Sequence, residues 1–547
     1  MDNNIVEIVN RFKKSNQRYC QFQGVKDSYG KVDDYNKDSF NKRIVELKRD
    51  IQYLREDMTN IEKTSGIAKI DLLTLYQVLE NELFQLEELK DYKKNPNVYL
   101  GPLETIQSIY IARSYAPLTE RVRHILATEK TFLTIIKQAP INLDPILAKV
   151  KIHLTVQSAN SLIAYLRDEL LEEIVKIEEK ELIEEWSKVN VEVVKAIENY
   201  IKLLQEEYLP KGTEEFALGT EKYLKMLEKS DGIKISIEKL LKVAEEDLDK
   251  NYSALMTIKK ELGEEEFKKT HEEHPREEEL VQETEKSMQR AKEFITEKKL
   301  VSIPFNETCQ VIETPGPMRA TTFAAMNPAN IAEESEATES YYYITPPDKK
   351  WTEEEREDYM KTFNRGTLET VTVHEVWPGH FLHFLHIKRL SPLARLLSDS
   401  YATIEGWAHY TEELAIEYNY EKINPIQFRI GQLTDALIRN CRFVASIKMH
   451  NYGMKFEEAK NLFIEKALLS EKGSEMEAKR GTVDPMYIKY TLGKLIIKKI
   501  REDYKKEKGT EFEIREFHDT FMSYGGIPLA LIRKSILEKN GLEEDIL

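Results

Sequence analysis

Five of the 11 histidines in the chain fall between Val373 and Tyr410, in a pattern typical of metal ligands. In the segment TVHEVWPGHFLHFLH, His374 is followed directly by Glu375 and, six residues on, by His380. Two imidazoles on one face of a helix can bind zinc while an intervening glutamate activates the water held by the metal. The pattern therefore predicts a zinc site with His374 and His380 as ligands and Glu375 as the general base.

The spacing differs from the usual H-E-x-x-H pattern, because six residues rather than four separate the two candidate ligands. Six steps of about 100° put His380 roughly 120° away from His374 on a regular helix. Pro378 lacks an N–H and its ring clashes with the carbonyl of His374, and Gly379 permits unusual backbone angles. A two-residue bulge there would return His380 to the metal-binding face. It would also bring His383 near that face as a rival ligand.

The third ligand is expected from a second helix packed beside the first. Glu405, in the segment IEGWAHY, is the candidate, and a carboxylate in this role leaves the fourth metal position open for water. His409, one turn after Glu405, could support the metal ligands or bind substrate. We interpret His386 and His450 as ordinary packed histidines.

Other residues could serve the substrate and the transition state. Tyr490 and Tyr487 are candidate hydroxyl donors to a developing oxyanion, and packed aromatic rings are the competing interpretation for both. Arg480 could pair with a substrate carboxylate, which would suit a carboxypeptidase, or form a structural ion pair. Arg319 and His518 are lesser candidates.

Helices must position these groups, because most of the chain has helical periodicity. In residues 43–64 the apolar side chains recur at three- and four-residue steps, at Ile44, Leu47, Ile51, Leu54 and Met58. The composition changes near residue 300, and Val301–Pro347 contains two β-like pieces, Cys309–Glu313 and Tyr341–Ile344. Helical periodicity resumes beyond Trp351.

The sequence thus predicts a mainly α fold of two lobes with a few short strands and a central cleft. We expect a helical N-terminal lobe over residues 1–300 and a catalytic, metal-binding region over residues 301–547. Intramolecular packing explains the N-terminal helices better than pairing between chains, and the sequence gives no oligomeric state.

Composition excludes several classes of protein. The 80 basic and 96 acidic residues give a net charge of −16, which argues against nucleic-acid binding. Three cysteines without paired spacing fit a reducing compartment. The N-terminus lacks the apolar core of a signal peptide. The sequence has no run of about 18 apolar residues, the length that crossing a membrane requires. We therefore expect a soluble, cytoplasmic protein with no membrane partner.

The motifs HEVWPGH (His374–His380) and EGWAHY (Glu405–Tyr410) resemble the family catalogued as domain of unknown function 885, placed in the H-E-x-x-H metallopeptidase clan. Other similar segments are ETPGPMRA, YYYITPP, RGTVDPMYIKYTLGK and FHDTFMSYGGIPLALI, so specific motifs cover roughly residues 300–547. The resemblance implies a largely helical fold related to the thimet-oligopeptidase and thermostable-carboxypeptidase groups, with the active site between lobes. It favours Tyr490, which lies in a shared Y-x-x-G pattern. Phe381 and His383 depart from the family, which commonly has His and Gln there.

These observations lead us to expect a zinc-dependent peptidase that hydrolyses short peptides as a carboxypeptidase or dipeptidase. One Zn²⁺ per chain is expected, with other divalent metals as alternatives. A metal-dependent hydrolase of a non-peptide amide or ester would use the same ligands. The third reading is a catalytically inactive helical interaction protein, against which Glu375 argues, because a structural zinc site needs no base.

Overall fold

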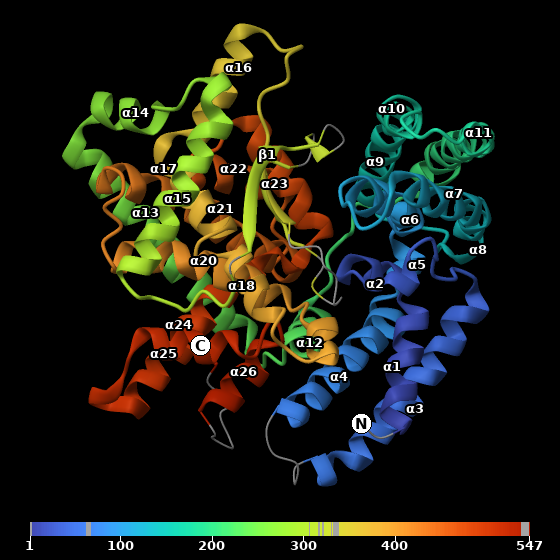
Figure 1. The fold of residues 1–547 in the computed structure, drawn as a ribbon, viewed down its shortest axis with the longest axis horizontal. Helices are drawn as coiled ribbons and strands as arrows, with labels where there is room; N and C mark the ends of the chain where they lie inside the picture. Colours follow the sequence, from blue (N-terminus) through green and yellow to red (C-terminus); the bar gives the residue numbers. More distant parts are fainter. Residues whose placement is uncertain are drawn as a thin grey trace.

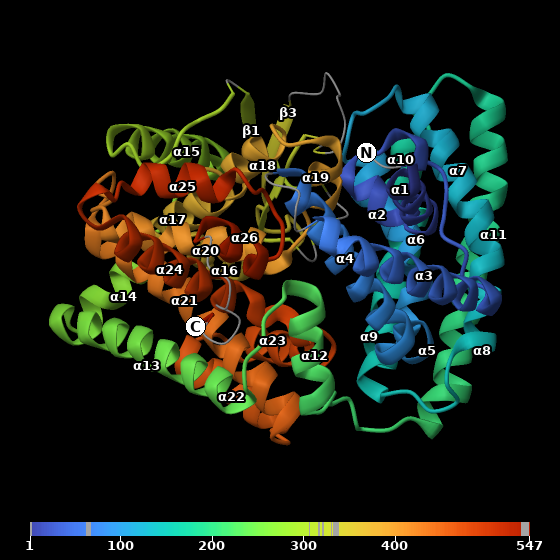
Figure 2. The same ribbon diagram turned by 90° about the horizontal axis from the view of Figure 1, so that it is seen from below.

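Helices dominate the structure. The computed structural model describes residues 3–61, 67–305, 307–315, 318–319, 322–329, 331, 339–537 and 546–547. Helices account for 75% of the residues and strands for 4%, which confirms the predicted mainly α fold. Figures 1 and 2 show the helices from α1 to α11 gathered on one side of the molecule and the rest of the chain on the other.

The first hydrophobic core is built from residues between Tyr29 and Tyr208. Its helices include α5 (Asp91–Lys94), α6 (Gly101–Thr105), α7 (Leu118–Ile135), α8 (Ala139–Asn142), α9 (Lys149–Arg167), α10 (Glu169–Ile174) and α11 (Lys180–Leu203). Trp186 of α11 is buried at its centre, and its indole N–H donates to Oε1 of Glu129 at 3.1 Å. This core packs the helices from α6 to α11 together.

The second and largest core runs from Tyr223 to Ile546. It includes four helices that precede the strands: α12 (Thr220–Asp231), α13 (Ile237–Leu262), α14 (Glu264–Glu272) and α15 (Leu280–Glu297). The two large cores therefore separate between Tyr208 and Tyr223. The change of composition near residue 300 lies inside the second core.

The remaining helices of the second core follow the strands. They are α16 (Glu353–Met360), α17 (Arg365–Glu375), α18 (His380–Ile387), α20 (Tyr401–Glu417), α21 (Pro425–Asn451), α22 (Phe456–Ala467), α23 (Glu471–Val483), α24 (Lys489–Lys508), α25 (Ile514–Met522) and α26 (Leu529–Ile536).

A third, smaller core joins the first four helices to the part of the chain that contains the second core. It contains leucines and isoleucines of α1 (Asn3–Ser15), α3 (Lys37–Ile61) and α4 (Ile67–Phe84), with Cys20 of α2 (Gln17–Gln23). Leu393, Leu396 and Leu397 of α19 (Pro392–Leu397) complete it. Because α19 connects α18 to α20, the N-terminal helices brace the chain between two helices that carry candidate metal ligands.

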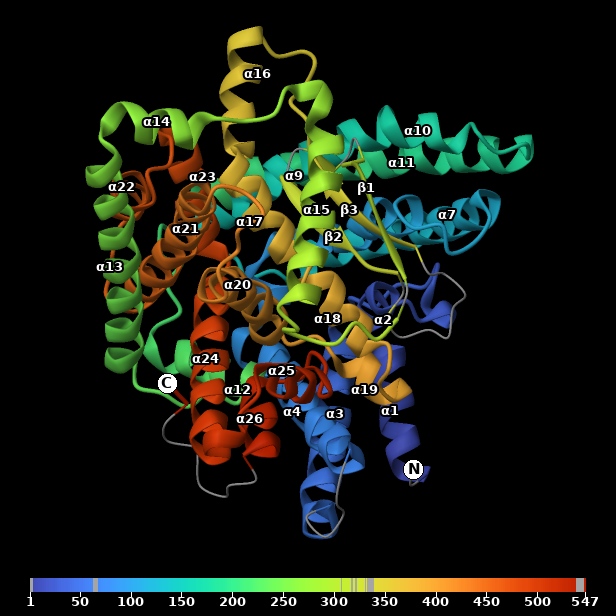
Figure 3. The same cartoon turned by 60° about the vertical axis from the view of Figure 1, so that its left-hand side comes forward.

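A small sheet lies beside α15 and α17 (Figure 3). Its strands are β1 (Thr308–Glu313), β2 (Ala324–Asn327) and β3 (Glu339–Ile344), in the order β1-β3-β2. β1 pairs with β3 in parallel, and β2 pairs with β3 antiparallel. The two predicted β-like pieces form β1 and β3, whereas β2 had no clear signal in the sequence.

One edge of β2 is unpaired within this sheet and faces the candidate site. The N–H of Thr345 donates to the carbonyl of Phe323, so these two residues form a hydrogen-bonded pair. Antiparallel pairs alternate, so the backbone groups of Ala324 and Met326 point away from β3.

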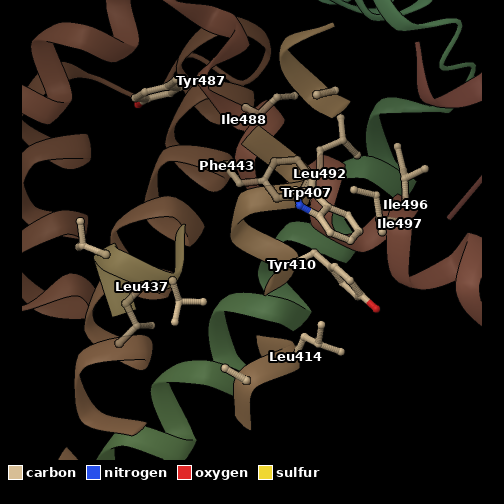
Figure 4. Packing of buried hydrophobic residues seen from close by; sticks show 14 of the residues in the cluster. Trp407, Tyr410, Leu414, Leu437, Phe443, Tyr487, Ile488, Leu492, Ile496 and Ile497 are labelled. Atoms are coloured by element: carbon tan, nitrogen blue, oxygen red, sulfur yellow. The ribbon is translucent and has the colours of Figure 1, made fainter. Parts of the chain in front are cut away.

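A pair of glycines brings α20 and α24 into close contact. A Cβ atom at Gly406 would lie 2.6 Å from the Cα of Gly493, and one at Gly493 would lie 2.1 Å from the carbonyl oxygen of Ala402. Figure 4 shows Trp407 and Tyr410 of α20 in the same hydrophobic cluster as Leu492, Ile496 and Ile497 of α24. This crossing of α20 and α24 sets the distance from Glu405, the candidate ligand on α20, to Tyr487 before α24 and to Tyr490 in its first turn.

Among the described residues, no helix has both the length and the apolar character that crossing a bilayer requires.

Candidate metal centre

Three candidate ligands from three helices meet at one point. His374 lies near the end of α17, His380 begins α18, and Glu405 lies in the second turn of α20. Oε2 of Glu405 is 3.4 Å from Nε2 of His374 and 3.4 Å from Nε2 of His380. The two imidazole rings are 4.8 Å apart and nearly perpendicular. The structure therefore brings together the three residues that the sequence predicts as ligands.

The break between α17 and α18 makes this convergence possible. The N–H of Gly379 donates to the carbonyl of Val373 at 3.0 Å, and that of Leu382 to Val376 at 3.3 Å. These bonds reach back six residues, where a regular helix reaches back four, so the predicted two-residue bulge is present. A Cβ atom at Gly379 would lie 1.7 Å from the carbonyl oxygen of His374. Glycine is required there because the backbones approach so closely.

The donor set fits a zinc ion. Bonds of about 2.1 Å in a tetrahedron place neighbouring ligand atoms about 3.4 Å apart, which is the separation of Glu405 Oε2 from each histidine nitrogen. Oε2 of Glu405 is buried and has no aligned hydrogen-bond donor among the described residues. Burial opposes ionisation of Glu405, but His380 and His374 outweigh it and hold its pKa well below the usual range. His374, His380 and Glu405 could therefore hold the ion.

A buried carboxylate sets the orientation of His374. Oε1 of Glu412 is 2.7 Å from Nδ1 of His374, and its Oε2 is 3.1 Å from Nδ1 of His409 and 3.3 Å from Nη1 of Arg439. Although Glu412 is buried, the charge of Arg439 and the hydrogen bonds from His409 and His374 hold its pKa well below the usual range, so it is ionised. An ionised carboxylate only accepts hydrogen bonds, so Nδ1 of His374 donates to Glu412 and Nε2 is the nitrogen that faces Glu405. Burial opposes protonation of His374, but Glu405 and Glu412 raise its pKa to about 9, so a metal would bind at Nε2 by displacing a proton.

The sequence alone did not indicate a role for Glu412. It lies seven residues after Glu405 and thus on the same face of α20. His409, predicted to support the ligands or bind substrate, is fully buried and bonds to Glu412. Burial lowers the pKa of His409 to about 4, so this ring is neutral.

Glu375 lies on the other side of the cluster. One oxygen of its carboxylate and one ring nitrogen of each of His374 and His380 lie within 4.8 Å of one another. Oε2 of Glu375 accepts a hydrogen bond of 2.7 Å from the N–H of Met326, one of the outward-pointing groups of β2. Burial raises the pKa of Glu375, and the two histidines only partly offset this. A carboxyl whose pKa is raised in a buried site is suited to acid–base catalysis.

The other histidines occupy packed positions. His383 is fully buried against Trp407, at 6.2 Å between ring centres, and lies outside the cluster of His374, Glu375 and His380. Burial lowers the pKa of His383 to about 3. His386 and His450, interpreted as packed histidines, bond to the carbonyls of Ser302 and Gly481. His518, a lesser candidate, bonds to the carbonyl of Leu300.

The tyrosines differ in their surroundings. The hydroxyl of Tyr401, at the start of α20, accepts from Nη2 of Arg480 at 3.4 Å and donates to the hydroxyl of Tyr490 at 2.6 Å. Tyr487 is fully buried, and its hydroxyl has no hydrogen-bond partner in the described part of the chain. Tyr401, one turn before Glu405, was not identified from the sequence.

The two arginine candidates both have carboxylate partners. Arg480 pairs with Asp484 at 3.0 Å as well as with Tyr401. Arg319 bonds to Glu313 at 2.6 Å and to the carbonyl of Thr314, within its own loop. Residues 316–317 and 320 of the motif around Arg319 lie outside the described residues.

A cavity of about 770 Å³ lies between the N-terminal helices and the part of the chain that contains the second core. Residues of α1, α3 and α4 line one side, and Ser400, Tyr401 and Lys489 line the other. The cavity therefore reaches the tyrosine that contacts Tyr490, one turn from Glu405.

Comparison with known proteins places the fold. A family model described as "Bacterial protein of unknown function (DUF885)" matches residues 19–536. A proposed lipoprotein of unknown function from Shewanella oneidensis superimposes with a TM-score of 0.81 at 21% identity, covering 97% of this chain and 98% of the other. A proposed lipoprotein from Colwellia psychrerythraea gives 0.75 at 17% identity, covering 96% of each chain. The search of curated proteins found no match. At these identities the two structures show a shared fold.

Proposed function

The chain belongs to the DUF885 family, and from the geometry of its site we propose that it is a zinc-dependent peptidase. It would hydrolyse short peptides as a carboxypeptidase or dipeptidase, in a two-lobed architecture with the site beside the cavity. The observation that carries the proposal is the convergence of His374 Nε2, His380 Nε2 and Glu405 Oε2, with Glu375 alongside. Three ligands and a free carboxylate are what a catalytic zinc site requires and a structural one does not.

His374, His380 and Glu405 would hold one Zn²⁺ per chain. When bound, the ion supplies a Lewis acid that polarises the peptide carbonyl and makes a water more acidic. Glu412 keeps His374 in the tautomer that leaves Nε2 free for the metal.

Glu375 would be the general base. Its carboxylate takes a proton from the attacking water and passes it to the nitrogen of the leaving amine. The bond from Met326 fixes the carboxylate while leaving its other oxygen, Oε1, to meet the water.

Tyr490 would stabilise the developing oxyanion. Arg480 donates to Tyr401 and Tyr401 donates to Tyr490, so the hydroxyl proton of Tyr490 is not used within this chain of bonds. It can therefore be donated to substrate, and such donors contribute strongly when charge develops on oxygen.

The outer edge of β2 would receive the backbone of the peptide. Backbone groups of Ala324 and Met326 point away from β3, towards the carboxylate of Glu375. An extended peptide can add to such an edge and pair with the groups that Glu375 does not occupy, namely the carbonyl of Met326 and the backbone groups of Ala324. Its scissile bond would then lie beside Glu375.

Elemental analysis and a mixed library of short peptides, with and without chelator, test the proposal. We expect about one zinc per chain, hydrolysis that a chelator stops, and loss of zinc in His374→Ala and Glu405→Ala. Glu375→Gln should keep its zinc and lose hydrolysis, whereas Glu354→Gln, on the exposed face of α16, should behave as the wild type.

Three results would contradict the proposal in different ways. Hydrolysis of esters but no peptide would indicate a different metal-dependent hydrolase. Zinc binding without hydrolysis would indicate an interaction protein. Full activity of Glu375→Gln with zinc retained would exclude this residue as the base.

A further inference from the structure

Three arginines gather around the tyrosine that lies beside the metal centre. The guanidinium carbons of Arg439 and Arg442, both on α21, are 5.8 and 5.4 Å from the ring centre of Tyr490. Arg480 reaches the same place through Tyr401. Residues three apart share one face of a helix, so Arg439 and Arg442 project to the same side of α21.

Two of these arginines have a carboxylate of their own. Arg442 donates from Nε and Nη2 to Glu477 at 2.8 and 2.7 Å. Nε and Nη2 of Arg480 lie 3.1 and 3.0 Å from Oδ2 of Asp484. Their charges are compensated within the protein.

Arg439 differs, because it shares its one carboxylate. Its single hydrogen bond to the described residues runs from Nη1 to Glu412 at 3.3 Å, and Glu412 also bonds to His374 and His409. Asp435, one turn earlier on α21, forms no ion pair with Arg439 in the described structure, and its Oδ2 is buried without a donor.

The remaining edge of Arg439 has no partner among the described residues. The side chain is 12% exposed, and its one hydrogen bond, from Nη1, leaves Nε and Nη2 unpaired among the described residues. Nε and Nη2 form the edge of a guanidinium that pairs with both oxygens of a carboxylate. Arg439 therefore offers a site for an anion.

Arg439 also lies close to the proposed oxyanion donor. The guanidinium carbon of Arg439 is 5.8 Å from the ring centre of Tyr490, and one extended residue spans about 3.5 Å. The last residue of a peptide whose carbonyl meets Tyr490 could thus reach Arg439 with its carboxylate.

Resting on the peptidase function proposed above, we propose that Arg439 binds the free C-terminal carboxylate of the substrate. The enzyme then acts as a carboxypeptidase that removes residues from the C-terminus. Arg480, the candidate from the sequence, instead orients Tyr401 through its bond to the hydroxyl.

Pairs of N-acetylated tetrapeptides, each with either a free C-terminal carboxylate or a C-terminal amide, test this role. The wild type should cleave the acids with a kcat/KM about 10- to 100-fold above that for the amides, as expected for a charge-assisted bond. Arg439→Gln should lose this preference by slowing the acids alone. Arg429→Gln, on the same helix and bonded to Gln432, is the matched control and should keep the preference.

A role limited to holding Glu412 would give a different result. Arg439→Gln would then slow acids and amides by the same factor, and this outcome, or a wild type without preference, overturns the proposal. Arg439→Lys keeps a positive charge beside Glu412 but lacks the two-nitrogen edge. It should retain zinc and still lose most of the preference.

Binding measurements separate this proposal from the peptidase function. In the Glu375→Gln background, calorimetry should show tighter binding of the acid than of the amide, and Arg439→Gln should abolish the difference. If the wild type cleaves neither peptide while this difference persists, the peptidase function fails and the carboxylate site stands. Equal binding of acid and amide refutes the carboxylate site, whether or not peptides are cleaved.

Discussion

His374 and Glu412 lie 38 positions apart in the chain and are joined by a hydrogen bond of 2.7 Å inside the protein. The bond fixes which nitrogen of His374 can reach a metal. Glu412 is fully buried, so this bond is not exchanged with water. The pairing of a candidate ligand histidine with a buried carboxylate provides the first prediction.

Glu412→Gln should weaken zinc binding about 10- to 100-fold, the usual cost of losing such a partner. Glutamine can still accept from Nδ1, but it no longer carries a negative charge that offsets the charge of the metal held by His374. Glu413→Gln is the control, since the neighbouring carboxylate bonds to Lys498 instead. Competition with a chromophoric chelator measures both affinities, and equal values for the two variants would show that Glu412 has no effect on the metal.

Tyr490→Phe should lower kcat about 100-fold with zinc content unchanged, because the variant lacks the donor proposed for the oxyanion. Tyr487→Phe should leave kcat within about twofold, since the Tyr487 hydroxyl has no partner among the described residues to lose. Steady-state kinetics on one peptide compare the two. A larger loss in the Tyr487 variant would reverse the assignment.

Gly406→Ala should destabilise the protein by at least about 3 kcal/mol or prevent folding, because the added methyl group would overlap the backbone of α24. Gly473→Ala, in the first turn of α23, meets nothing closer than 3.3 Å. Its effect should stay within about 1 kcal/mol. Urea unfolding followed by circular dichroism measures both. A wild-type midpoint for Gly406→Ala would mean that the two helices can separate without cost.

Glu129→Gln should stabilise the N-terminal part at neutral and higher pH. Burial raises the pKa of Glu129 to about 8, from 4.5 for an exposed glutamate, and its Oε2 has no partner in the described residues. The folded state thus holds a proton that the unfolded state releases above pH 4.5, so stability falls as the pH rises from about 4.5 to 8. At pH 7 the cost is on the order of 3 kcal/mol.

Denaturation midpoints of the Glu129→Gln and wild-type proteins at pH 5 and pH 8 check this prediction. The two proteins should agree at pH 5 and differ most at pH 8. A constant difference across this range would show that Glu129 does not titrate on unfolding.

The sequence predicted the part of the site that depends on local spacing. The Pro378-Gly379 pair indicated a bulge, and the structure has it, with His374 and His380 turned towards Glu405. Such features follow from the backbone chemistry of a few neighbouring residues.

The sequence did not predict features that depend on distant partners. Glu412 and Glu413 are adjacent and identical in type, yet one bonds to the candidate ligand His374 and the other to the half-buried Lys498. Which is which follows only from how α20 packs against α17 and α21. Likewise the segment Ala324–Asn327 has a weak strand propensity, and it forms β2 through its pairing with β3.

The third core also has a consequence for how the protein is made. Leucines of α3 and α4 leave the ribosome about 300 residues before the leucines of α19 that cover them. At about 5–20 residues per second, these apolar side chains wait at least about 15 s for their partners. During synthesis, the N-terminal helices therefore present a leucine-rich surface on which chaperones can act, until α19 covers it between the two helices that carry His380 and Glu405.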